Sequence, residues 1–182
     1  RRSMKGIVFT ELLEMVEERF GMEMVDTIIT ESTLPSGGNY TAVGTYDRSE
    51  IIELVSRLEA KTGLEAKLLY QTYGEHLFGR FGVLYPSFFK QVPNAFSFLE
   101  LVNDHIHKEV LKLYPDAELP SFATHRNGDS QLVMHYKSQG QMADFAHGLI
   151  LGCLKYFKEE ADVATEVIDQ NATEVLFTIT LK

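Results

Sequence analysis

HKEVLKLYPDAELP, residues 107–120, contains the sharpest change of pattern in the chain. Ahead of it, apolar residues recur every three or four positions, which predicts a helix that Asn94 caps and that runs to Tyr114. Pro115 ends this helix, because proline lacks the amide hydrogen that a continuing helix needs. After Pro120 the period becomes two, which is typical of strands. The chain therefore passes here from a helical part to a part that contains a sheet.

The same two periods extend outward from this stretch. Asp47 or Ser49 can cap a helix that ends at Gly63, and an Asn127-Gly128 pair between two alternating segments predicts a β-hairpin. Further helices are expected over 7–20, 22–30, 64–84 and 142–157, and strands over 122–125, 132–136, 161–168 and 174–181.

This order of elements predicts an α+β fold, in which a helical N-terminal subdomain packs on a C-terminal α/β subdomain with an antiparallel sheet. With 182 residues the chain is most simply one domain, 4–182, divided into about 4–63 and about 64–182. Residues 1–3, Arg1-Arg2-Ser3, stand ahead of Met4 and are set aside as a remnant of cloning.

Composition excludes several classes of function. A net charge of −9 argues against a nucleic-acid partner, because no basic stripe could neutralise a row of phosphates. No apolar run approaches the roughly 20 residues that span a bilayer, so neither a membrane partner nor a membrane location is expected. The single cysteine, Cys153, excludes an internal disulfide and a thiolate zinc cluster. A cytoplasmic protein is the default expectation.

Histidines are the most reactive candidates that the sequence offers. His105 and His107 lie two positions apart on one expected helix, so about 200° separates them and they cannot bind one metal together. Spacing alone leaves open whether either binds a metal or is merely hydrogen-bonded. No nucleophile in a turn motif accompanies them, and Cys153 is expected to be a buried small apolar residue. We therefore do not expect an enzyme.

Taken in order, these features resemble one family. Met4-Lys5-Gly6 at the start, His107 before Leu113-Tyr114-Pro115, Tyr136-Lys137-Ser138 on a strand and a Gly148-Leu149-Ile150 helix are similar to the haem nitric oxide/oxygen-binding (H-NOX) domain. The resemblance spans 4–182 and is to the bacterial stand-alone type, related to the haem domain of soluble guanylate cyclase. It implies the fold predicted above and haem b as cofactor.

The resemblance also assigns residues around the haem. His107 would be the axial ligand of the iron, Pro120 would press on the porphyrin, and Tyr136 and Ser138 would bind the propionates. The family motif is Tyr-x-Ser-x-Arg, and Gly140 stands here in place of the arginine. This departure removes one expected propionate anchor.

On the opposite side of the haem, the resemblance decides which gas binds. Members that hold oxygen stably carry a tyrosine where this chain has Phe145. Without that hydroxyl the implied ligands are NO and CO, with oxygen excluded. Gly74, one of three glycines in the expected helix 64–84, matches a glycine that serves as a hinge. The rest of the distal wall would be Leu12, Phe78, Phe81 and Leu149.

The resemblance finally implies how a signal leaves the domain. NO would weaken the bond between iron and His107, the haem would flatten against Pro120, and the released helix would shift. The output would pass to a separate effector, commonly a sensor histidine kinase or a cyclic-di-GMP enzyme. Two alternatives stay open: a haem-poor protein-interaction module, which Gly140 favours, and an oxygen sensor with a distal donor elsewhere in the sequence.

Overall fold

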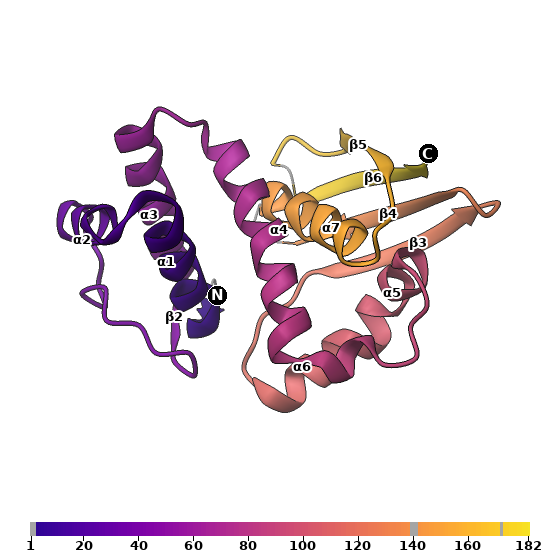
Figure 1. Cartoon of the computed structure of the whole chain (residues 1–182), viewed down its shortest axis with the longest axis horizontal. Coiled ribbons are helices and arrows are strands. Elements are labelled where there is room, and N and C mark those ends of the chain that lie inside the picture. The colour runs from indigo at the N-terminus through magenta and orange to yellow at the C-terminus, as the bar shows by residue number, and fades with distance from the viewer. Residues whose placement is uncertain (1–2, 139–141, 172) are drawn as a thin grey trace.

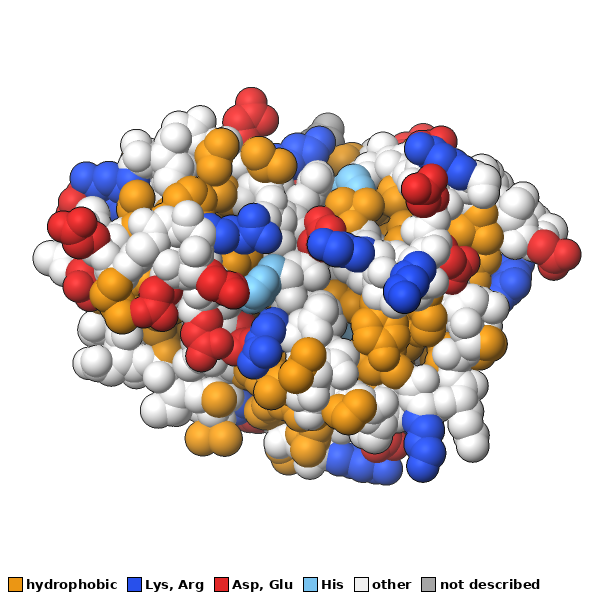
Figure 2. Space-filling model, viewed as in Figure 1, with side chains coloured by type: hydrophobic (Ala, Val, Ile, Leu, Met, Phe, Trp, Pro, Cys, Tyr) orange, Lys and Arg blue, Asp and Glu red, His pale blue; other side chains and the backbone are white. Residues whose placement is uncertain are grey.

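Two packed halves build the fold, and a long helix runs between them (Figure 1). A computed structural model of the chain describes residues 3–138, 142–171 and 173–182. The helical half contains α1 (Gly6–Phe20), α2 (Met22–Glu31) and α3 (Arg48–Thr62), and α4 (Ala66–Leu84) follows it. Within the described residues no helix has both the length and the apolarity needed to cross a membrane. The face drawn in Figure 2 intersperses acidic and basic side chains and carries no continuous basic surface.

Local signals set the ends of the N-terminal helices as expected. The Asp47 carboxylate accepts a hydrogen bond from the Ser49 amide, so Asp47 is the cap of α3. Gly63 ends α3 in the left-handed conformation, with φ at 76°.

Two short strands at this end of the chain were not expected. β1 (Ser3–Lys5) pairs with β2 (Thr45–Asp47) in an antiparallel ribbon. Ser3 takes part in the fold, because it is buried and its hydroxyl donates to Glu118 at 2.9 Å. Strands of three residues are too short for their period to be recognised in a sequence.

The single helix expected from Asn94 to Tyr114 was also wrong in one respect. Its cap is confirmed, since Asn94 accepts from the Ser97 amide at 2.8 Å. The helix is divided, however, into α5 (Ala95–Leu101), a π-helical turn η2 (Val102–Ile106) and α6 (His107–Leu113). A π turn takes in an extra residue and so re-aims the side chains that follow it. A 3₁₀ turn, η1 (Pro86–Phe89), precedes α5.

The sheet of the C-terminal half is confirmed as predicted. β3 (Ser121–Asn127), β4 (Gln131–Lys137), β5 (Ala161–Val167) and β6 (Glu174–Leu181) form one antiparallel sheet in the order β3-β4-β6-β5. The helix α7 (Ala143–Tyr156) lies across this sheet (Figure 1). Alternate residues of β4 are buried beneath the helices, and they are Leu132, Met134 and Tyr136.

Glycines let α4 and α7 approach backbone to backbone. A Cβ on Gly74 would lie 2.4 Å from the Phe145 carbonyl oxygen, and one on Gly148 would lie 2.2 Å from the Gln71 carbonyl oxygen. Close packing against α7 therefore requires a glycine at position 74. It does not require one at position 79, around which the space is open.

Gly74→Ala should lower the free energy of unfolding by about 1–3 kcal/mol, because the two helices must separate to admit the methyl group. Gly79→Ala is the matched control on the same helix and should raise it by up to about 1 kcal/mol, since alanine favours the helix. Urea denaturation monitored by circular dichroism measures both. A Gly74→Ala protein as stable as Gly79→Ala would contradict the backbone contact.

Candidate functional site

A cavity of about 260 Å³ lies where the two halves meet. One side is formed by β1, the start of α1 and the first residue of α3, and the other by α4, the α5–α6 region, β4 and α7. Most of the lining side chains are aliphatic or aromatic. Such a wall with a few polar groups suits a largely apolar ligand that is oriented by specific contacts.

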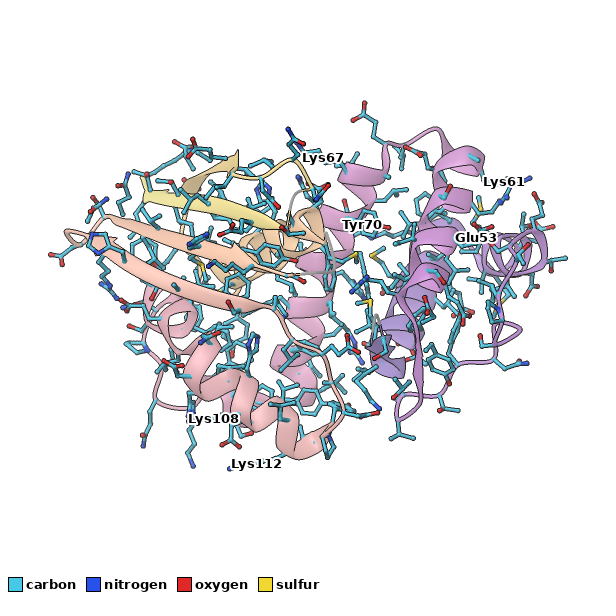
Figure 3. The ribbon with its side chains drawn as sticks, turned by 180° about the vertical axis from the view of Figure 1, so that it is seen from behind. Glu53, Lys61, Lys67, Tyr70, Lys108 and Lys112 are labelled. Carbon is cyan, nitrogen blue, oxygen red and sulfur yellow. The ribbon has the colours of Figure 1, made fainter. Side chains whose placement is uncertain are left out.

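His107 brings a nitrogen donor to this cavity. It is the first residue of α6, directly after the π turn, and its ring lies 6.2 Å from that of Phe122. Lys108 and Lys112 project outward from the same helix (Figure 3). Burial lowers the pKa of His107 to about 4, so the imidazole is neutral at pH 7. Its side chain makes no hydrogen bond within the described residues, which leaves a ring nitrogen available to a ligand.

The site cannot hold a free metal ion by itself. Among residues 3–138, 142–171 and 173–182, no group of three or more His, Cys, Asp or Glu side chains could bind one. His105, the nearest histidine in sequence, is exposed. One histidine in an apolar cavity instead fits a metal whose other ligands come from a flat prosthetic group, as in haem proteins.

Pro120 lines the same cavity, directly ahead of β3. The amide of Phe122, at the start of β3, donates to the Asn103 side chain of the π turn at 3.0 Å. This bond holds the strand entry beside the turn that aims His107.

Tyr136 and Ser138 come to the cavity from the end of β4. Burial raises the pKa of Tyr136, although its hydrogen bond with Ser138 opposes the rise. Lys137 is exposed, and its Nζ lies 3.6 Å from Oε1 of Glu174. Its side chain therefore faces away from the cavity, as expected. Gly140, expected in place of an arginine, lies outside the described residues.

Of the expected distal wall, the structure brings together Phe78, Phe81, Phe145 and Leu149. It does not bring Leu12 there. Leu12 is buried in the core of the helical half, packed with residues of α1 to α4, and is not among the side chains that line the cavity. The spacing of apolar residues predicts that Leu12 lies on the buried face of α1. It cannot tell whether a residue on that face packs in the core or lines a cavity.

The tyrosine hydroxyls near the cavity have protein partners. Tyr73 stacks on Phe145 with ring centroids 5.4 Å apart, and its hydroxyl donates to the Val8 carbonyl. The hydroxyls of Tyr85 and Tyr114, which both line the cavity, bond to each other at 2.6 Å.

His147 and Cys153 do not contribute to the cavity. The His147 ring nitrogen Nδ1 lies 3.3 Å from the Gln71 amide, and His147 does not line the cavity. Burial raises the pKa of the Cys153 thiol, which suits the buried apolar role expected of it and not that of a nucleophile.

Two basic residues of the wall were missed by the sequence analysis. Lys5 lines the cavity and forms an ion pair with Asp116 at 2.9 Å. Arg48 also lines it and is only 8% exposed. One signal could have singled out Arg48: it directly follows the cap residue Asp47, where the helix dipole disfavours a cation.

Comparisons with known proteins agree with this site. The chain matches the HNOB family model, described as Haem-NO-binding, over residues 5–165. The Fe(II) unliganded H-NOX protein from K. algicida is 42% identical, with 98% of this chain and 97% of that chain covered and a TM-score of 0.93. The H-NOX from Shewanella woodyi, solved bound to IWP-051 in the Fe(II)CO state, is 39% identical, with 97% and 94% covered and a TM-score of 0.83.

A more distant structure shares the fold. An H-NOX protein from S. oneidensis in the Fe(II)NO state is 23% identical, with 98% and 99% covered and a TM-score of 0.91. The search of curated proteins found no match.

The groups that line the cavity are those that a haem needs for binding. It offers one neutral imidazole from His107, hydroxyls from Tyr136 and Ser138 for carboxylates, and an otherwise largely apolar wall. The chain therefore belongs to the Haem-NO-binding, or H-NOX, family of haem-based gas sensors, and haem is its cofactor.

Proposed function

We propose that this chain senses nitric oxide, also binds carbon monoxide, excludes oxygen and signals to a separate effector. The observation that carries the proposal is that a half-buried, neutral His107 shares one cavity with the Tyr136–Ser138 pair and an apolar distal wall. When bound, haem would supply a ferrous iron able to take up a diatomic gas. Relatives solved in Fe(II)NO and Fe(II)CO states, from S. oneidensis and S. woodyi, support this choice of gases.

His107 is the proposed axial ligand. Because burial holds its pKa near 4, the ring already presents a lone pair at neutral pH and no proton has to leave. The π turn before it and the Asn103–Phe122 hydrogen bond fix the direction from which it approaches. Tyr136 and Ser138 are the proposed propionate contacts, since hydroxyls can donate to carboxylates.

Discrimination against oxygen follows from the distal side chains. Bound oxygen carries partial negative charge and gains about 1.5–3 kcal/mol from a hydrogen bond to it. Phe145, Phe78 and Leu149 offer no donor. The hydroxyl of Tyr73, which stacks on Phe145, is engaged with Val8.

The proposed signal is carried by α6. Release of His107 would free this helix from the cavity, and Leu111 and Leu113 on its surface are 39% and 51% exposed, where a partner can contact them. A sensor histidine kinase or a cyclic-di-GMP enzyme is the proposed effector, as the family resemblance implies. The Gly140 departure supports a haem-poor interaction module, but a cavity that already holds an unpaired imidazole favours the haem sensor.

His107→Ala should abolish the protein ligand of the iron, because no second histidine lines the cavity. The ferrous absorption spectrum of the reconstituted protein should change, and added imidazole should restore it. His105→Ala is the matched control, since this neighbour is exposed and its loss should leave the spectrum unaltered. An unchanged spectrum in His107→Ala would refute the ligand assignment.

Phe145→Tyr should create a stable oxygen complex, with oxygen affinity increased by about ten- to a hundredfold for the gain of one hydrogen bond of about 1.5–3 kcal/mol. Admitting air to the reduced protein and recording the absorption spectrum measures this. Phe145→Leu keeps the wall apolar, so neither this variant nor the unmodified chain should form a stable oxygen complex. A stable oxygen complex in the unmodified chain would show that another donor faces the gas.

A further inference from the structure

Arg48 is a buried cation for which the described part of the chain supplies no ion-pair partner. It is the first residue of α3, 8% exposed, and its side chain lines the cavity. Within residues 3–138, 142–171 and 173–182, no hydrogen bond or ion pair joins its guanidinium to another group. Lys5, another basic residue of the wall, is by contrast paired with Asp116.

The carboxylates nearest in sequence and around the cavity are engaged elsewhere. Glu50, two residues further along α3, accepts from the Ser36 and Tyr40 hydroxyls at 2.5 and 2.9 Å. Asp47 caps the helix through the Ser49 amide. Glu118, which also lines the cavity, accepts from the Ser3 hydroxyl.

Leaving Arg48 in this state is costly for two reasons. A buried charge without a partner loses its hydration and gains little in return. A cation at the first position of a helix is also repelled by the positive end of the helix dipole. Both costs fall when an anion enters the cavity beside Arg48.

The place such an anion would occupy is indicated by Tyr136. The positive charge of Arg48 acts on the Tyr136 hydroxyl and lowers its pKa, against the larger effect of burial. Tyr136 is in turn hydrogen-bonded to Ser138, so a guanidinium from the helical half and two hydroxyls from the end of β4 line the same cavity.

We propose that Arg48 binds a haem propionate in this chain, and so supplies from α3 the guanidinium that the family motif places at position 140. A planar guanidinium can donate two parallel hydrogen bonds to one carboxylate, which neither Tyr136 nor Ser138 can do. The inference rests on the proposed function and adds to it: the haem would be anchored to both halves of the fold, because Tyr136 lies in β4, Ser138 directly follows β4, and Arg48 begins α3.

The test compares Arg48→Gln with Arg57→Gln, a matched change on the same helix at a residue that does not line the cavity. The rate at which reconstituted protein loses haem to excess apomyoglobin should rise about tenfold or more in Arg48→Gln, and tenfold corresponds to about 1.4 kcal/mol. Arg57→Gln should leave the rate unaltered. Adding Gly140→Arg to Arg48→Gln should slow the loss again.

A second readout separates binding from a merely structural role. Haem-free Arg48→Gln should melt at or above the temperature of the unmodified haem-free chain, because an unpaired buried charge is gone. Adding haem should raise the melting temperature of Arg48→Gln by less than it raises that of the unmodified chain. If Arg48→Gln fails to fold, Arg48→Lys can replace it. Lysine keeps the positive charge but cannot donate two parallel hydrogen bonds, so this variant should lose haem faster than the unmodified chain and by less than tenfold.

Two results would overturn the proposal. One is haem loss from Arg48→Gln at the unmodified rate, and the other is equal destabilisation of its haem-free and haem-bound forms. An unmodified chain that takes up no haem would instead refute the proposed function itself.

Discussion

The backbones of α4 and α7 touch where Gly74 and Gly148 lie, and the cavity depends on this contact. α4 supplies Leu77 to the core of the helical half and Phe78 to the core of the sheet half, so its position sets both. The atom nearest to the missing Cβ of Gly74 is the carbonyl oxygen of Phe145, a residue that lines the cavity. The glycine therefore fixes the wall directly. Its expected role as a hinge stays a prediction, whereas its need for close approach has a physical reason in the structure.

Apolar packing of Phe145 and Leu149 against the helical core also joins the halves, and polar contacts add to it. Thr45 and Lys5 both donate to Asp116, at 2.7 and 2.9 Å, and Ser3 donates to Glu118. These acids follow α6 in the chain, so the bonds join the helix of His107 to the β1–β2 ribbon. The Asp116 side chain is 51% exposed, and ion pairs at such sites contribute about 1 kcal/mol or less. Movement of α6 can thus break them at little cost, while the glycine contact stays in place.

Much of this arrangement was predictable because it rests on local signals. Period and capping chemistry gave the helices, the hairpin and the Asn94 cap, and the family resemblance placed His107. The π turn before His107 was not predictable, since nothing in its sequence differs from an ordinary helix and its Asn103 bonds to a strand far along the chain. Arg48 and Leu12 show the same limit. Whether a side chain faces a cavity or a core depends on which segments meet there, and periodicity reports only that the face is buried.

The cavity selects its ligand through the polar groups in its wall that have no hydrogen-bonding or ion-pairing partner in the part of the chain that the structure describes. Its apolar wall favours any flat hydrophobic molecule, so burial alone gives affinity without orientation. Among the described residues that line the cavity, two polar groups lack a hydrogen-bonding or ion-pairing partner: the neutral imidazole of His107 in the sheet half and the guanidinium of Arg48 in the helical half. A simple hydrocarbon satisfies neither. A ring with an electron-accepting metal at its centre and carboxylates at its edge satisfies both, and it can do so in one orientation only. Haem has this chemistry, and in binding it would join the two halves through one molecule.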